Sequence, residues 1–217
     1  MKSIMIEELY QSGVIAIIRG ISEEKIGETV QALYDGEVRA VEIALNTSGA
    51  LRMIEKVKAD FGGKMCVGAG TVLDTESARA AILAGADFLL SPTLSVRVIE
   101  ICNRYSKLMV PGVLTPTEIL TAWEAGARLL KVFPAGTFGP QYFKDVKGPL
   151  PQVELMPVGG VSLENAGCFI RSGAHSLGVG NQLVNPSLVQ QGLFQEITKR
   201  AGEFVGHVRE ARISCDS

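Results

Sequence analysis

The chain has 217 residues, of which 47% are hydrophobic and 20% are charged, and its formal net charge at pH 7 is −2. These values fit one globular domain and exclude the strongly basic surface of a nucleic-acid-binding protein. No run of about 18 apolar residues occurs, so we expect no membrane span and no membrane partner. The first residues also lack the apolar core of a signal peptide.

Short apolar segments alternate with helical patterns along the chain. The expected strands are residues 14–19, 40–45, 65–70, 87–91, 108–112, 129–133, 154–158 and 176–179. The expected helices are residues 22–35, 49–60, 75–84, 95–105, 116–125, 140–147, 163–172 and 187–210. This alternation is typical of parallel sheets, and eight units of this kind predict a single (β/α)8 TIM barrel over residues 1–217. An open doubly wound sheet is the alternative fold.

The two ends of the chain are expected to lie outside the repeating pattern. We expect residues 1–12 to form a short N-terminal helix that caps the bottom of the barrel. We expect residues 213–217 to be a disordered tail, because chain ends without apolar contacts are poorly ordered.

The sequence carries little that could bind a metal ion or form disulfide bonds. Its four cysteines are widely spaced, and its two histidines have no neighbouring ligand pattern. A disulfide framework or a zinc site is therefore not expected. We expect a protein without metal or cofactor, and its cysteine usage fits a reducing, cytoplasmic environment.

Two charged residues interrupt strands that are otherwise apolar. Lys131 lies within strand 129–133, and burial would lower its pKa and leave a neutral amine that can attack a carbonyl carbon. Glu42 lies within strand 40–45, on the strand face that also carries Asn46. A carboxyl group near the amine would supply the proton transfers of Schiff-base chemistry. Solvent-facing or edge-strand positions are the alternative for both residues.

Glycine-rich turns follow the last two strands, at the end of the barrel where active sites lie. Gly159 and Gly160 follow one strand, and Gly180 and Asn181 follow the other. Such turns let backbone N–H groups approach a phosphate, although a tight turn alone also favours glycine. Arg19, at the end of the first strand, can pair with a carboxylate, or with an acidic side chain at the rim.

Several short motifs occur in order between residues 13 and 183. They are Val41-Glu42-Ile43, Gly68-Ala69-Gly70-Thr71-Val72, Ser91-Pro92, Pro111-Gly112-Val113-Leu114-Thr115-Pro116-Thr117-Glu118, Leu130-Lys131-Val132-Phe133-Pro134, Gly148-Pro149, Gly159-Gly160-Val161 and Gly178-Val179-Gly180. Through these motifs the chain resembles the class I aldolases that cleave 2-keto-3-deoxy-6-phosphogluconate and 4-hydroxy-2-oxoglutarate.

The resemblance implies a role for each matching residue. Lys131 would form the Schiff base and Glu42 would act as general acid and base. We expect the substrate to be a small, phosphorylated, anionic keto acid that is held by residues from several strand ends: Arg19, Asn46, Thr71, Pro92, Phe133, Gly159, Gly160, Gly180 and Asn181. Among these, Thr71 would bind the keto-acid carboxylate, Phe133 would pack near the pyruvate methyl group, and the glycine turns would bind the phosphate. The resemblance also implies a homotrimer without a metal ion.

The chain departs from the family pattern at three positions. Asn46 stands where many members have an arginine that binds the carboxylate, and we expect Arg19 to supply that charge. Val158 stands where many members have threonine, and Asn181 where many have serine. The variation at Asn46 also occurs in the subgroup that acts on 2-keto-3-deoxy-6-phosphogalactonate.

The expected reaction is cleavage of 2-keto-3-deoxy-6-phosphogluconate to pyruvate and glyceraldehyde 3-phosphate, or of 4-hydroxy-2-oxoglutarate to pyruvate and glyoxylate. Cleavage of the phosphogalactonate isomer is the alternative substrate choice. A non-catalytic phosphate-binding barrel and a phosphate-sugar isomerase are the alternative functions, since the fold alone permits both. Neither of these needs both Lys131 and Glu42 in apolar strands.

Overall fold

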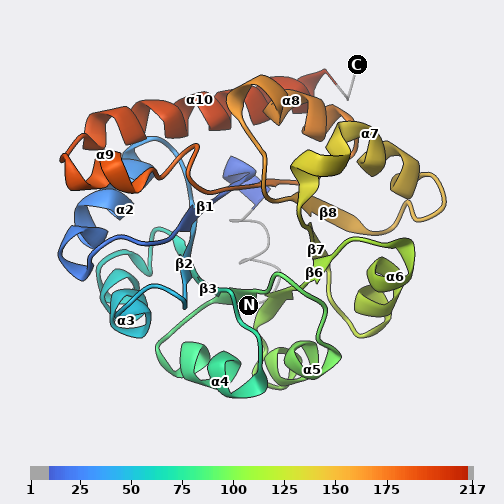
Figure 1. Cartoon of the computed structure of the whole chain (residues 1–217), viewed down its shortest axis with the longest axis horizontal. Coiled ribbons are helices and arrows are strands. Elements are labelled where there is room, and N and C mark those ends of the chain that lie inside the picture. Colours follow the sequence, from blue (N-terminus) through green and yellow to red (C-terminus); the bar gives the residue numbers. More distant parts are fainter. Residues whose placement is uncertain (1–9, 215–217) are drawn as a thin grey trace.

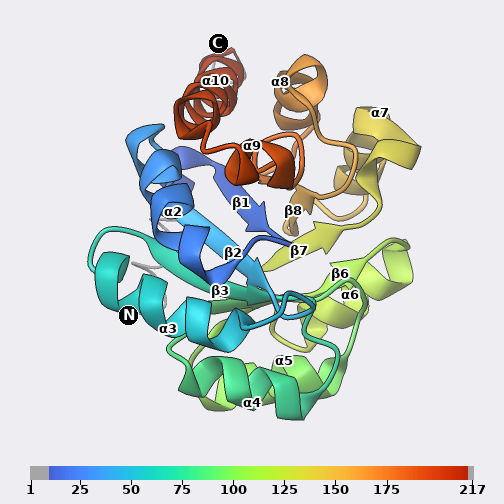
Figure 2. The same cartoon turned by 60° about the vertical axis from the view of Figure 1, so that its left-hand side comes forward.

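The computed structural model of the chain describes residues 10–214. Within this range the strands pair in parallel, and helices surround them on the outside (Figure 1). One sheet has the strand order β5-β4-β3-β2-β1-β9, and the other has the order β6-β7-β8. Figure 2 shows the same strands from the side, enclosed between α2 to α5 on one side and α7, α8 and α10 on the other. The protein therefore has an α/β fold with a parallel-strand centre.

The secondary structure follows the expected alternation. The strands are β1 (Val14–Ile18), β2 (Ala40–Ala44), β3 (Cys66–Gly70), β4 (Phe88–Leu90), β5 (Leu108–Val110), β6 (Gly112–Val113), β7 (Leu129–Val132), β8 (Glu154–Pro157) and β9 (Leu177–Val179). The helices are η1 (Glu23–Lys25, a 3-10 turn), α2 (Ile26–Asp35), α3 (Ala50–Phe61), α4 (Thr75–Leu83), α5 (Val96–Arg104), α6 (Pro116–Glu124), α7 (Ala135–Lys147), α8 (Leu163–Arg171), α9 (Pro186–Gln190) and α10 (Phe194–Ile213).

Pro111 divides the strand expected over residues 108–112 into β5 and β6. Proline has no backbone N–H to continue a ladder, but its carbonyl accepts a hydrogen bond from Lys131 N at 2.9 Å. β5 pairs with β4 in one sheet, and β6 pairs with β7 in the other. Near β8 and β9, single parallel bridges join Leu155 to Ala174 and Val158 to Gly178. The two sheets therefore contact each other at both places where they meet, near Pro111 and between β8 and β9.

Side chains alternate between two separate apolar cores, as expected for strands with a period of two. Ile15, Phe88 and Leu129 belong to the smaller core, which lies inside the ring of strands, together with Ala40 and Cys66. Their strand neighbours belong to the larger core between the strands and the helices. The smaller core defines the inner face of each strand. Toward the C-terminal ends of the strands, this face continues to Glu42 and Lys131.

Three helical segments differ from the sequence-based expectation. α7 begins at Ala135 rather than at residue 140, because two helical pieces join across Gly139, whose backbone is non-helical at φ 70°. The helix expected over residues 187–210 is divided into α9 and α10, and Gly192 between them has φ 71°. Ser22 precedes a 3-10 turn rather than the first turn of α2. The positive φ of Gly139 and of Gly192 favours glycine and interrupts the regular helical geometry at both positions.

The two ends of the described chain meet at the N-terminal ends of the strands. Residues 10–12 are helical, and residues 1–9 of the expected N-terminal helix lie outside the described residues. The Tyr10 hydroxyl donates to Glu154 at the start of β8, and Arg212 near the end of α10 donates to the carbonyl of Tyr10 at 2.7 Å. α10 continues to Ile213, and residues 215–217 of the expected tail lie outside the described range. In the described range, no helix is long and apolar enough to cross a membrane.

Candidate active site

Lys131 and Glu42 both lie on the inner face of their strands. Leu129, two residues before Lys131, and Ala40, two residues before Glu42, belong to the inner core. The period-two alternation therefore points both charged side chains inward, directly above that core. Lys131 is 5% exposed and Glu42 is 1% exposed. The expected inward orientation is what the structure has, and the solvent-facing alternative is wrong for both residues.

Burial shifts the pKa of both groups toward their neutral forms. Desolvation lowers the pKa of the Lys131 amine; the charge of Glu42 opposes this shift, and the charge of Arg19 adds to it. Desolvation likewise raises the pKa of the Glu42 carboxyl, against the charges of Lys131 and Arg19. Glu42 Oε2 is buried without a hydrogen-bond partner. A neutral amine beside a carboxyl group that can gain or lose a proton is the pairing that carbonyl chemistry on lysine requires.

Arg19 and Thr71 meet at the ends of β1 and β3. Arg19 Nη2 donates to Thr71 Oγ1 at 3.4 Å, and Arg19 is exposed. Ile17, two residues before Arg19, is part of the inner core, so the arginine continues the inner face above the strand end. No carboxylate among residues 10–214 forms an ion pair with Arg19. The alternative that Arg19 pairs with an acidic side chain at the rim is therefore wrong within this range.

Thr71 has a left-handed backbone conformation with φ 58°, which is rare for a β-branched residue. Such strain concentrates at functional sites because the surrounding structure must maintain it. Asn46 follows β2 and is exposed. Asn46 therefore presents a neutral amide after the end of β2, the strand that pairs with β1 just before Arg19.

Phe133 and Pro92 lie near Lys131 at the other side of the site. Lys131 Nζ is 5.1 Å from the centroid of the Phe133 ring, which is a cation–π distance when the amine is charged. The Phe133–Pro134 peptide bond is cis. Pro92 packs against Gly112, where an added Cβ atom would lie 2.2 Å from the Pro92 carbonyl carbon. Gly112 is the β6 partner of Lys131, so Pro92 lies one strand away from the amine.

The glycine turns after β8 and β9 lie next to the start of α7. Gly159 and Gly160 have φ 83° and 79°. The Gly159 carbonyl accepts from Gly136 N at 2.7 Å, and a Cβ atom on Gly160 would lie 2.7 Å from Gly136 Cα. The Gly180 carbonyl accepts from Leu183 N at 2.8 Å, and Asn181 beside it is exposed. Because a bridge joins Val158 to Gly178, the two turns emerge side by side.

Comparisons with known proteins identify the family of the chain. The sequence model of the family described as KDPG and KHG aldolase matches residues 5–200. The chain belongs to this aldolase family. It is 37% identical over 199 residues to the 2-dehydro-3-deoxy-6-phosphogalactonate aldolase of Escherichia coli, covering 91% of this chain and 95% of that protein. It is 29% identical over 203 residues to the 2-dehydro-3-deoxy-phosphogluconate aldolase of Pseudomonas aeruginosa, covering 93% and 92% of the two chains.

Solved structures of similar proteins lead to the same assignment. A structure described as native KDPGal aligns with a TM-score of 0.86 and 36% identity over 92% of this aldolase and 96% of that chain. KDPG aldolase from Legionella pneumophila, with pyruvate captured as a covalent carbinolamine, aligns with a TM-score of 0.83 at 24% identity, over 90% and 95% of the two chains. The aldolase is thus a lyase with a TIM-like fold of parallel strands.

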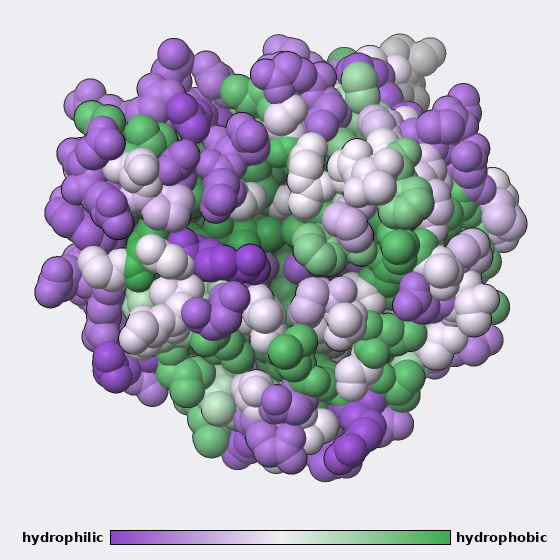
Figure 3. Space-filling model, viewed as in Figure 1, coloured by the Kyte–Doolittle hydropathy of each residue, from purple (hydrophilic) through white to green (hydrophobic). Residues whose placement is uncertain are grey.

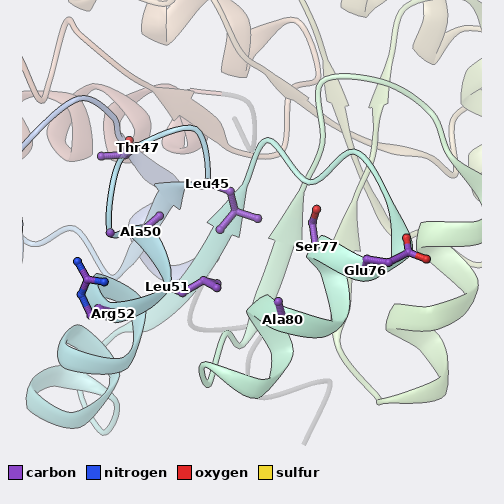
Figure 4. A pocket seen from close by; sticks show the side chains of 9 residues that line it. Leu45, Thr47, Ala50, Leu51, Arg52, Glu76, Ser77 and Ala80 are labelled. Carbon is purple, nitrogen blue, oxygen red and sulfur yellow. The ribbon is translucent and has the colours of Figure 1, made fainter.

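A cavity of about 500 Å³ lies outside the buried pair of Lys131 and Glu42. It is formed between α3 and α4, and Figure 4 shows Leu45, Thr47 and Arg52 on one side of it and Glu76 and Ser77 on the other. Neither Glu42 nor Lys131 lines this cavity. The sequence did not indicate it, because its walls come from two helices and a loop that meet only in the folded aldolase.

Thr47 is a site-proximal residue that the sequence analysis missed. Its side chain is 8% exposed, and its hydroxyl accepts from Gly20 N at 3.1 Å. This bond fixes the residue after Arg19 against the loop that carries Asn46. Its only sequence signal was its place directly after Asn46. In the described part of the chain, no group of three or more His, Cys, Asp or Glu side chains is placed to hold a metal ion.

Proposed function

We propose that this aldolase cleaves a 2-keto-3-deoxy-6-phospho sugar acid through a Schiff base on Lys131. The observation that supports this most directly is that Lys131 and Glu42 are both buried on the inner face, each with its pKa shifted toward the neutral form. In a non-catalytic barrel, two buried ionisable groups would only lower the stability, because removing each of them from water costs free energy.

The proposed reaction begins with attack of the neutral Lys131 Nζ on the C2 carbonyl carbon of the substrate. The Glu42 carboxylic acid donates a proton to the carbinolamine hydroxyl, which leaves as water and gives an iminium ion and the Glu42 carboxylate. Glu42 takes the proton of the C4 hydroxyl, and the C3–C4 bond breaks with its electron pair moving into the C2–C3 bond of an enamine. The aldehyde leaves. Protonation of C3 by the Glu42 carboxylic acid and addition of water to C2 then release pyruvate and the free amine.

The ends of the substrate are assigned to the two groups of residues around the catalytic pair. We assign the keto-acid carboxylate to Arg19 and Thr71, because a guanidinium and a hydroxyl can both donate to it. We assign the phosphate to the turns at Gly159–Gly160 and Gly180–Asn181, because the three glycines carry no side chain that would block a close approach of the backbone. No cofactor is needed, because the iminium group on Lys131 accepts the electrons that the breaking C3–C4 bond releases.

We propose the phosphogalactonate isomer as the preferred substrate, ahead of the phosphogluconate isomer and 4-hydroxy-2-oxoglutarate. The support is the 37% identity to a phosphogalactonate aldolase, compared with 29% to a phosphogluconate aldolase. Asn46 also has the residue type found in the galactonate-specific subgroup. The isomers differ at C4, so their relative kcat/KM values test this choice.

We further propose that the two linked sheets form the complete eight-stranded barrel and that the aldolase acts as a homotrimer in the cytoplasm. Exposed apolar side chains support self-association: Leu73 is 59% exposed, Leu83 is 69% exposed and Leu120 is 40% exposed. Figure 3 shows apolar side chains gathered over the part of the surface that α4 and α5 occupy in Figure 1. Light scattering would measure the assembly directly.

Borohydride reduction in the presence of pyruvate tests the proposed chemistry. The wild-type chain should gain one reduced pyruvate unit, mapped by peptide mass spectrometry to Lys131. Lys131→Arg should not be labelled, because an arginine side chain stays protonated and forms no imine. Lys144 on α7 provides the control, since Lys144→Arg should leave labelling intact. Label on another lysine, or none on the wild type, would rule out the mechanism.

A further inference from the structure

Gly70, the last residue of β3, lies directly against the carboxyl group of Glu42. A Cβ atom on Gly70 would lie 1.3 Å from Glu42 Oε1 and 1.9 Å from Glu42 Cδ. The carboxyl group therefore occupies the space that the side chain of any other residue would fill. We infer that Gly70 is a positioning residue that sets where the catalytic carboxyl group can stand. This inference rests on the proposed function, because it concerns the same Glu42.

The need for glycine at this position comes from space and not from backbone conformation. Gly70 does not have the positive φ that Gly159 and Gly160 have. It is instead held in regular pairing: its register partner in β2 is Ala44, and its carbonyl accepts from Leu45 N at 2.8 Å. With the backbone fixed on this side, a larger residue cannot move away, and the Glu42 side chain has to move.

Packing, rather than hydrogen bonding, holds the Glu42 carboxyl group in place. The side chain is 1% exposed, and its Oε2 has no hydrogen-bond partner. The charges of Lys131 and Arg19 act on it, but neither forms an ion pair with it in the described residues. A carboxyl group without a fixed donor takes the position that its neighbours leave open. Gly70 leaves that position open on the β3 side.

Gly68 provides a matched control on the same strand face. It lies two residues before Gly70, and a Cβ atom there would lie 2.3 Å from the Phe88 ring. Phe88 is 1% exposed and belongs to the inner core, so its ring has little room to move. Gly68→Ala should thus lower stability through the core. The three atoms nearest to a Cβ atom on Gly70 all belong to the Glu42 side chain, so Gly70→Ala should change the proton transfer more than the stability.

Pyruvate in deuterated water separates these effects. Once pyruvate is bound to Lys131 as an iminium, Glu42 removes a methyl proton and returns a deuteron, and NMR follows the exchange. Borohydride trapping measures iminium formation separately. Gly70→Ala should retain trapping and lower the exchange rate about 100-fold, the effect of a roughly 1 Å misplacement of a catalytic group. Gly68→Ala should exchange at nearly the wild-type rate per folded molecule and have a lower melting temperature.

Shortening the acid tests the contact itself. Glu42→Asp is one methylene shorter, so its carboxyl carbon takes the Cγ position, 2.6 Å rather than 1.9 Å from an added Cβ atom at position 70, and the clash is smaller. Adding Gly70→Ala to Glu42→Asp should therefore change both the exchange rate and the melting temperature less than adding it to the wild type. An equal loss in both backgrounds, an unchanged exchange rate, or an unfolded double variant would overturn the inference about Gly70. A wild type that traps no pyruvate at Lys131 would instead remove the proposed function, so the two failures are distinguishable.

Discussion

Replacing Arg19 with alanine should weaken substrate binding without destabilising the fold. Arg19 is exposed, its one side-chain hydrogen bond is the 3.4 Å contact to Thr71 Oγ1, and it forms no ion pair among residues 10–214. Loss of such a contact changes the free energy of unfolding by less than about 0.5 kcal/mol. A charge-assisted bond to a substrate carboxylate contributes about 1.5–3 kcal/mol, or about 10- to 150-fold in binding.

The same substitution should also move the pH profile. The positive charge of Arg19 contributes to the lowered pKa of Lys131, so its removal should raise that pKa. The protonated amine cannot attack a carbonyl, so the rate falls as the pH drops through the pKa of Lys131. In Arg19→Ala this fall should begin at a higher pH than in the wild type.

Steady-state kinetics across pH and thermal unfolding measure both effects. Arg52→Ala is the matched control: Arg52 is also exposed, but it pairs with Glu23 at 2.9 Å, and an exposed pair of this kind contributes about 0–1 kcal/mol. The control should keep its KM and its pH profile. A lower melting temperature for Arg19→Ala, combined with an unchanged KM and an unchanged pH profile, would refute the reasoning.

Two further predictions concern the buried pair. Glu42→Gln should keep the fold and slow proton transfer by about 10²- to 10⁴-fold while part of the pyruvate trapping survives, and full turnover by this variant would remove Glu42 from the mechanism. The pKa of Glu42 is raised by folding, so the free energy of unfolding should fall as the pH rises above 4.5, the pKa of this group in the unfolded chain. The pKa of Lys131 is lowered by folding, so the free energy of unfolding should also fall as the pH drops below 10.5, the pKa of this amine in the unfolded chain. At pH 7 the inactive double variant Glu42→Gln/Lys131→Met should thus be more stable than the wild type, by about 1–4 kcal/mol in chemical denaturation, and a less stable double variant would contradict this.

The inner positions of the site were predictable because they depend on a local rule. Side chains alternate along a strand, and this alternation placed Glu42 and Lys131 inward whichever strands were their neighbours. The start of α6 was predictable for the same reason: Pro116 is the first helical residue, and Thr115 and Glu118 form a capping box. Strand alternation and helix capping both depend on residues that are close together in the sequence, so a single segment is enough to predict them.

The remaining features depend on contacts between distant segments. Residues 135–139 contain two glycines and have weak helix propensity, so the start of α7 at Ala135 could not be read from them. Asp87 accepts from Lys58 Nζ at 2.6 Å and from Val67 N at 3.0 Å, and both partners are at least 20 residues away in the sequence. The space requirement at Gly70 is likewise visible only once β2 and β3 are placed in register.

The contacts of Tyr10 and Arg212 have a practical consequence for handling this aldolase. They place the two described ends together at the N-terminal ends of the strands, near Glu154 and His175. Arg19 and Thr71, which we assign to the substrate, meet at the opposite end of the strands. A fluorescent label placed on the described ends would therefore lie opposite the entrance that we propose for the substrate, and it should leave substrate binding unchanged.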